Sequence, residues 1–254
     1  MSNMYDSVCY KRSFLKEVIL RVDFGSRVET FMRALPQKIA TAALQRFPLA
    51  EPKKAQTREV TFSGTAVQAK TEESMEWVYH GKNREKSLTI TPEALLVTNR
   101  RYESFEALRE DTDHVLRTLF EAQKDLSVAR VGLRYINILD VAGDAPLLWT
   151  DYVNEEMLGI IDMHKDAAAL TRVFHIVEFN YDGQQVKFQF GIANPDYPAP
   201  IKRKQFVLDL DSFFVGALSQ EDVSRYIEAA HERIQALFEE SITDKTRALM
   251  DPAA

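Results

Sequence analysis

The chain has 254 residues, of which 45% are hydrophobic and 28% charged, the composition of a globular protein long enough to bury a sizeable core. A net charge of −6 disfavours non-specific binding to nucleic acid or to anionic membranes, and a single cysteine, Cys9, excludes an internal disulfide and a cysteine-based zinc site. Met1–Ser13 has no apolar stretch of signal-peptide length and no window could span a bilayer, so we expect a cytoplasmic protein that does not enter a membrane.

The first half of the chain alternates between strand and helix patterns. Leu15–Phe24 reads as a strand with alternate apolar residues on one face. Arg27–Arg46 carries a helical apolar stripe, which Pro36 should kink or divide. A proline-interrupted connection to Lys54 leads to a run of short strand patterns, at Arg58–Ser63, Ala66–Lys70, Met75–His80, Lys86–Thr91 and Ala94–Asn99. A helix over Ser104–Ala122 follows, with Ser104 as its N-cap.

The second half repeats this order loosely. A strand over Arg130–Asp140 is followed by a predicted helix over Trp149–Met163. Asp182-Gly183 between alternating segments predicts a hairpin, with strands Thr171–Asn180 and Gln185–Ile192. After a strand over Phe206–Asp211, a long helix begins at Ser219, and Asp222 completes a capping box with that serine.

Both halves therefore read as strand, helix, β-meander and helix. This order predicts an α+β protein with a curved antiparallel sheet and helices packed on it. It also suggests a diverged duplication, with an N-terminal half over residues 1–125 and a C-terminal half over residues 126–254, packed as one globular unit.

Two stretches carry a resemblance to a known family. The run Gly132-Leu133-Arg134-Tyr135-Ile136-Asn137 and the C-terminal stretch Phe238–Lys245 resemble a sporadically distributed family of uncharacterised bacterial proteins. Shorter matches lie in Leu15–Phe24 and Phe206–Asp211. A patchy distribution implies transferred genes, and hence a role in a bacterial defence or mobile-element locus. The resemblance implies no reaction and no catalytic residues.

The central strand supplies the candidate ligand-binding residues, which are Arg21, Arg134, Tyr135 and Asn137. If the strands of Arg21 and Arg134 are neighbours, the two guanidinium groups could bind a phosphate or carboxylate. In the alternative interpretation, each arginine pairs with a nearby acid such as Glu17 or Glu178. Tyr135 and Asn137 then serve as satisfied polar groups of the core.

Carboxylates suggest a metal site. Asp209 and Asp211 share one strand face and, together with Asp140 or Asp23, could hold Mg²⁺ for phosphoryl transfer. Alternatively, Asp211 caps a turn into Ser212-Phe213-Phe214 and Asp209 faces water. A weaker candidate is the Asp162-x-His164-x-Asp166 spacing. His231 is expected to face solvent, and His175 to lie in a core or an interface.

Basic clusters offer an alternative function, nucleic-acid or nucleotide binding by a basic sheet face. They are Lys53-Lys54, Lys82–Lys86, Arg100-Arg101 and Lys202-Arg203-Lys204. The segment Ala193–Lys204 is rich in proline, bears Tyr197 and suits protein contacts. Because no catalytic set is visible, we expect a non-catalytic accessory protein without a cofactor, acting through a protein partner or as a homo-oligomer.

Overall fold

The computed structural model of the chain describes residues 10–63, 66–161, 163 and 166–251. These residues form two compact units. Unit 1 comprises the described residues of 1–18, 132–214 and 226–254, and unit 2 comprises those of 19–131 and 215–225. Among the described residues, no helix combines the length and the apolar character needed to cross a bilayer.

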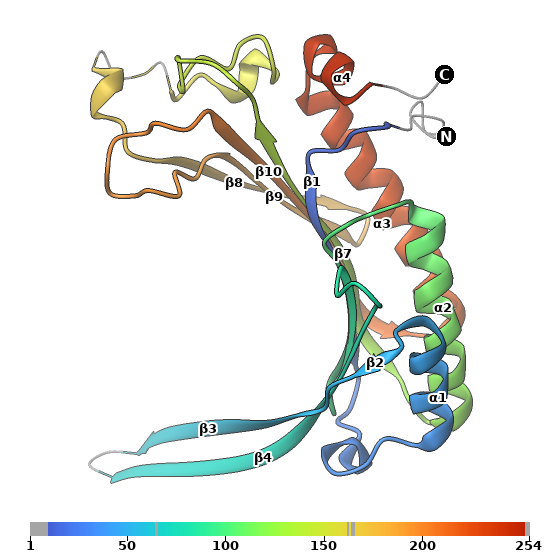
Figure 1. Cartoon of the computed structure of the whole chain (residues 1–254). Helices are drawn as coiled ribbons and strands as arrows, with labels where there is room; N and C mark the ends of the chain where they lie inside the picture. Colours follow the sequence, from blue (N-terminus) through green and yellow to red (C-terminus); the bar gives the residue numbers. More distant parts are fainter. Residues whose placement is uncertain (1–9, 64–65, 162, 164–165, 252–254) are drawn as a thin grey trace. The chain divides into compact units, whose positions relative to one another are not determined.

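Ten strands form one antiparallel sheet with the order β2-β4-β5-β6-β1-β7-β10-β9-β8, and β3 pairs with β4 outside this path (Figure 1). The strands of the first half are β1 (Leu15–Phe24), β2 (Leu49–Ala50), β3 (Lys53–Ser63), β4 (Ala66–His80), β5 (Lys86–Ile90) and β6 (Ala94–Asn99). Those of the second half are β7 (Val128–Asp140), β8 (Val173–Tyr181), β9 (Gln184–Ile192) and β10 (Gln205–Leu218).

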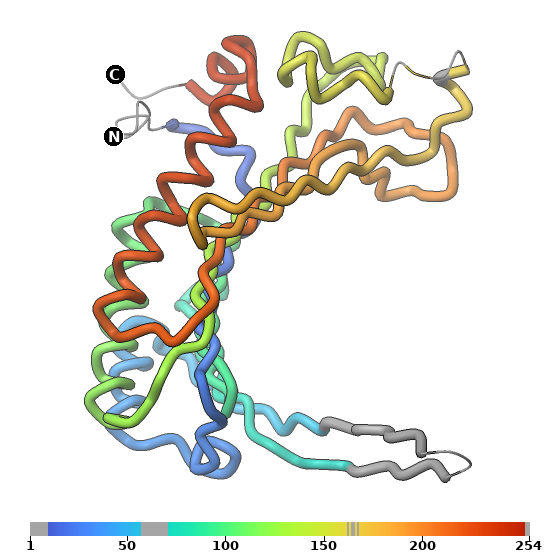
Figure 2. Tube along the Cα trace, turned by 180° about the vertical axis from the view of Figure 1, so that it is seen from behind, coloured from blue at the N-terminus to red at the C-terminus, as the bar shows by residue number. Residues whose placement is uncertain are grey.

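A helix follows the meander of each half, α2 in the first and α3 in the second, and α1 precedes the meander of the first half. Unit 2 contains α1 (Gln37–Arg46) and α2 (Phe105–Ala122), which lie side by side (Figures 1 and 2). The helix α3 (Gln220–Ser241) precedes the short α4 (Asp244–Met250). The described residues also form the 3₁₀ turns η1 (Glu29–Met32), η2 (Glu155–Met157) and η3 (Ala167–Ala169).

The predicted fold class, an α+β protein with a curved antiparallel sheet and packed helices, is confirmed. The two halves share a strand order: β4-β5-β6 ends beside β1, and β8-β9-β10 ends beside β7. A duplication would produce this repetition, and common ancestry of residues 1–125 and 126–254 stays a prediction.

Alternation along the strands separates a covered face from an open face. In β1 the buried residues are Val18, Leu20, Val22 and Phe24, as the apolar pattern predicts. In β7 the residues 131, 133, 135, 137 and 139 are buried, whereas Arg134 and Ile138 on the other face are half-buried. The long polar side chains of β7 therefore lie on both faces.

Several predicted boundaries hold because local chemistry sets them. Pro36 divides Arg27–Arg46 into η1 and α1, and it is the N-cap of α1. Ser104 caps α2 by accepting a hydrogen bond from the backbone N–H of Ala107. Ser219 and Asp222 bond each other's backbone N–H groups, which is the predicted capping box.

The predicted helix over Trp149–Met163 is wrong. The segment forms turns and η2, and Val153 pairs with Ile242 in an isolated β-bridge. Trp149 is fully buried and its indole N–H donates to the carbonyl of Pro146. Tertiary contacts with the end of α3 therefore override the local helical pattern.

Some strands are longer than predicted. The connection up to Lys54 contains β2 and the start of β3, and the three patterns between Arg58 and His80 belong to only two strands, β3 and β4. β10 continues to Leu218, so Asp211 and Ser212-Phe213-Phe214 lie within a strand and not at the expected turn. Burial explains this difference, because Ser212 and Phe214 belong to the covered face of the strand.

Candidate functional site

Arg134 and Asp209 form a bidentate ion pair in unit 1. Arg134 Nε and Nη2 donate to the two carboxylate oxygens of Asp209 at 2.7 and 2.6 Å, from the neighbouring strands β7 and β10. Asp209 is only 5% exposed, and Gln189 Nε2 lies 3.4 Å from the same carboxylate. The hydrogen bonds to Asp209 raise the pKa of the Arg134 guanidinium above its usual value. This bidentate geometry commits Arg134 to an internal partner.

Arg21 lies in unit 2 and is also engaged. Its Nε donates to Asp23, two residues along the same strand face, at 2.7 Å. Arg130 approaches the same carboxylate at 3.6 Å. Each predicted arginine thus pairs with an acid, Arg21 with Asp23 and Arg134 with Asp209, and the charge of Glu17 also acts on Arg134.

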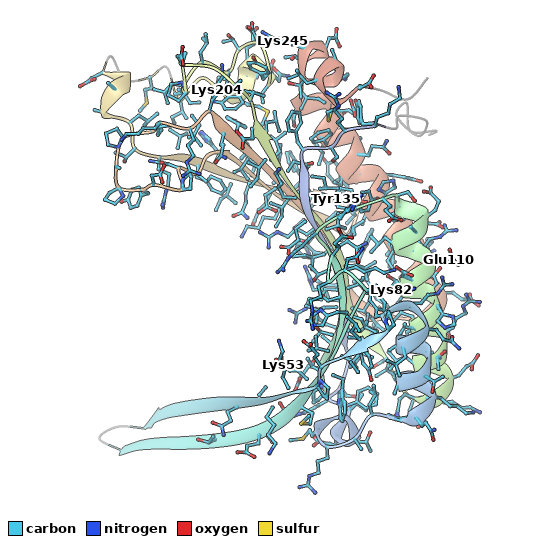
Figure 3. The ribbon with its side chains drawn as sticks, in the orientation of Figure 1. Lys53, Lys82, Glu110, Tyr135, Lys204 and Lys245 are labelled. Atoms are coloured by element: carbon cyan, nitrogen blue, oxygen red, sulfur yellow. The ribbon has the colours of Figure 1, made fainter. Side chains whose placement is uncertain are left out.

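Tyr135 and Asn137 lie on the covered face of β7. Figure 3 labels Tyr135 on the sheet. Tyr135 Oη is 3.0 Å from His231 Nδ1 of α3, and Asn137 Nδ2 lies 3.4 Å from the carbonyl oxygen of Leu208. Both side chains are buried, which fits satisfied core polar groups. His231, which was predicted to face solvent, is half-buried, and Tyr135 covers part of its ring.

The carboxylates proposed for Mg²⁺ do not converge on a site. Asp211 shares the open face with Asp209, but Arg134 holds Asp209, so the expectation that Asp209 faces water is wrong. Asp140 accepts a hydrogen bond from Gln205 at 3.0 Å. Within the part of the chain that the structure describes, no three histidine, cysteine, aspartate or glutamate side chains are grouped to bind a metal. Asp162 and His164 lie outside the described residues.

The exposed edge of unit 1 is the first feature that sequence reasoning missed. β8 ends the strand order and pairs only with β9 in the described part of the sheet. Along it, Phe174, Ile176 and Val177 are 41%, 57% and 37% exposed. The strand β8 contains no proline or lysine, and its only ionisable side chains of acidic or basic type are Glu178 and His175. Such a strand lacks the usual protection against pairing with another chain.

The proline-rich segment lies next to this edge. Asn194 is buried, and its Nδ2 donates to the carbonyl oxygens of Thr171 and Ala199, both at 2.8 Å. The guanidinium of Arg172 stacks 3.9 Å from the ring centroid of Tyr197. A cavity of about 380 Å³ separates this loop from the sheet face. Arg172 is thereby held in place immediately before the first residue of β8.

In the basic cluster Lys202-Arg203-Lys204, the side chain of Lys204 is buried and not on a basic surface. Lys204 is 9% exposed, and its Nζ lies 4.8 Å from the ring centroid of Tyr152 and 5.7 Å from that of Trp149. Lys245 Nζ lies 4.7 Å from the centroid of the same Tyr152 ring. These cation–π contacts anchor the segment around Trp149, so Lys204 is not a solvated lysine.

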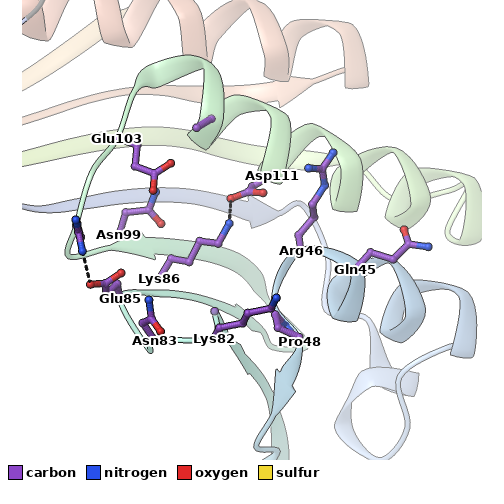
Figure 4. A pocket seen from close by; sticks show the side chains of 13 residues that line it. Gln45, Arg46, Pro48, Lys82, Asn83, Glu85, Lys86, Asn99, Glu103 and Asp111 are labelled. Carbon is purple, nitrogen blue, oxygen red and sulfur yellow. Dashed lines mark hydrogen bonds and ion pairs between the residues drawn. The ribbon is translucent and has the colours of Figure 1, made fainter.

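Two other basic clusters meet in unit 2. The turn between β4 and β5, with Lys82 and Lys86, and the residues after β6, with Arg101, line one polar pocket (Figure 4). Lys86 Nζ donates to Asp111 of α2, and Arg101 pairs with Glu85 at 3.2 Å. The sequence indicated the basic residues of this pocket but not the acids that α2 and the turn place next to them.

No protein-family model matches the chain, and no curated protein matches it in sequence.

Proposed function

We propose that the protein is a non-catalytic binding protein that self-associates through the edge strand β8 and acts as an accessory component for a protein partner. The exposed, unprotected edge of β8 carries this proposal. Its backbone N–H and C=O groups can extend the sheet by pairing with another strand. Its exposed apolar side chains would then be covered, which adds a hydrophobic contribution.

A second copy of the chain is the occupant that the strand fits best. In an antiparallel pairing centred on His175, Arg172 lies opposite Glu178 of the second copy, and Glu178 opposite its Arg172. In the same register Phe174 meets Ile176. The only two charged groups of the stretch 172–178 are thereby paired, and directly opposed apolar pairs each contribute about 0.2–1 kcal/mol. Arg172 is already oriented by its stack on Tyr197.

The test is the mass of the particle in solution, measured by sedimentation velocity between about 1 and 100 µM. We expect a dimer, and Ile176→Lys should make the protein monomeric because it places a charge at the centre of the pairing. Val215→Lys is the matched control, since Val215 is also an exposed apolar strand residue, in β10. A monomeric protein throughout this range would refute self-association through β8.

Charge reversal examines the register itself. Arg172→Glu and Glu178→Arg should each weaken the dimer, because each places like charges opposite one another, and the double variant should recover it. Failure of the double variant to associate, with both single variants folded, would contradict the pairing centred on His175.

The biological setting rests on the resemblance of Gly132–Asn137 and Phe238–Lys245 alone. We infer from it a role in a bacterial defence or mobile-element locus. Tagged protein recovered from its host tests this role when the eluate is analysed for protein and nucleic acid. A stoichiometric protein partner that Ile176→Lys loses would support the accessory role, and RNA or DNA released by salt would overturn it.

A further inference from the structure

The cavity beside the proline-rich segment has features of a ligand site that the proposed function does not use. Its volume of about 380 Å³ is at the lower end of the range for small-molecule sites. Its walls come from β7 and β10 on the sheet side and from the loop after β9 on the other side, and every residue that lines it belongs to unit 1. Among these residues Arg172 alone is charged, so the cavity favours a ligand with a negative charge.

The Arg172 guanidinium is held in position but has no acidic partner. It stacks on the ring of Tyr197, and its Nε donates to the carbonyl oxygen of Ala193 at 3.2 Å. Within the described part of the chain, no carboxylate pairs with this guanidinium and no acceptor bonds to its terminal nitrogens. The side chain is exposed, so a ligand can reach these nitrogens. A guanidinium with a free edge binds a carboxylate through two parallel hydrogen bonds.

The remaining walls suit an apolar group. Ile138 and Val207 line the cavity from the open face of the sheet and are half-buried. The two amide side chains of the lining are engaged within the protein, since Asn194 donates to two backbone carbonyls and Gln205 donates to Asp140. A ligand therefore meets one cation and otherwise mostly apolar or already bonded groups.

We propose that this cavity binds a small organic carboxylate with a compact apolar body. The carboxylate accepts hydrogen bonds from the two terminal nitrogens of Arg172, and the apolar body lies against Ile138 and Val207. A single unpaired cation matches a single negative charge. The carboxylate of Asp140, 3.0 Å from Gln205 Nε2, disfavours a doubly charged phosphate in the same cavity. Because Arg172 is already held by Tyr197 and Ala193, binding orders little of the protein.

The bound carboxylate also regulates the proposed dimer. Arg172 Nε is engaged by Ala193, so the guanidinium has one free edge made of its two terminal nitrogens. In the pairing centred on His175, Glu178 of the second copy uses that same edge. The ligand and the second copy therefore compete for Arg172, and saturating ligand shifts the dimer towards monomer. This regulation rests on self-association through β8, whereas binding of the carboxylate does not.

Calorimetric titration of the full chain carrying Glu178→Gln tests the site, because this substitution removes the competing carboxylate and adds no charge. The probe is 4-methylpentanoate. Its amide lacks the charge and acetate lacks the apolar body, so each should bind at least about tenfold more weakly. Arg172→Ala should weaken binding of the probe by at least about tenfold, since it removes two charge-assisted hydrogen bonds. Arg12→Ala is the matched control, because Arg12 is an exposed arginine of unit 1 outside the cavity.

The site is overturned by absence of binding at about 10 mM probe, by equal binding of the amide or of acetate, or by equal affinity of the Arg172 and Arg12 variants. Sedimentation velocity of the wild type at saturating probe tests the competition. A larger monomer fraction supports it, and an unchanged dimer contradicts it. A wild type that is monomeric without the probe refutes self-association and the competition together, while the calorimetric result still decides the site.

Discussion

The Arg134–Asp209 pair makes an asymmetric prediction about stability. The Asp209 side chain is 7% exposed, whereas that of Arg134 is 38% exposed. Arg134→Ala leaves a buried carboxylate with only the long contact from Gln189, whereas Asp209→Ala leaves a guanidinium that can turn to water. Removing one partner of a buried ion pair costs about 3–5 kcal/mol. Because Arg134 is partly exposed and solvent screens it, we expect the lower end, about 3 kcal/mol, for Arg134→Ala.

Loss of Asp209 should cost less, about 1–2 kcal/mol, since the remaining guanidinium is solvated. For a chain of this size each kcal/mol shifts the melting temperature by about 2–4 °C, so Arg134→Ala should lower it by about 6–12 °C. Thermal unfolding followed by circular dichroism measures both variants. Equal losses, or a larger loss for Asp209→Ala, would refute the assignment of the buried charge. The double variant Arg134→Met, Asp209→Leu should recover part of the loss, because no unpaired charge remains.

Three further predictions follow from local geometry. Gly191→Ala should lower the free energy of unfolding in urea by more than about 2 kcal/mol, because the φ of Gly191 is +136° and the new Cβ would lie 2.3 Å from the carbonyl oxygen of Val173. Gly159→Ala is the control and should be nearly neutral, since a Cβ at Gly159 would meet open space. Ser219→Ala should cost about 1 kcal/mol by removing the capping box of α3, which helical circular dichroism during unfolding reports, and an unchanged midpoint would contradict it. Hydrogen bonding from Arg84 lowers the pKa of Glu51 from its ordinary value near 4.5 to about 2. The wild type should therefore have a higher melting temperature than Glu51→Gln at pH values above 4.5, and this difference should vanish as the pH falls through 2. A difference in melting temperature that persists below pH 2 would argue against the ion pair.

Features set by neighbours along the chain were predictable from sequence. The alternation in β1 and β7, the capping residues Ser104 and Ser219, and the Asp182-Gly183 turn each follow from local backbone and side-chain chemistry. Asp182 and Gly183 both have positive φ, the conformation that this hairpin turn requires. The helix predicted from Trp149 failed for the opposite reason, since Asp151, Tyr152 and Asn154 form hydrogen bonds with residues about 90 positions away, near Ile242.

The candidate site also shows the difference between features set by neighbours along the chain and features set by the arrangement of the strands. Alternation correctly placed Arg134 on one face and Tyr135 on the other, but it could not say which acid would meet the arginine. That acid depends on the lateral strand order, which brings β10 beside β7 and leaves Glu178 on the outer strand β8. The same order makes Glu178 available to a second copy of the chain instead of to Arg134. A polar residue of a sheet can therefore be assigned to ligand binding only once the neighbours of its strand are known, which is why Arg134 is not a candidate although its face of β7 was predicted correctly.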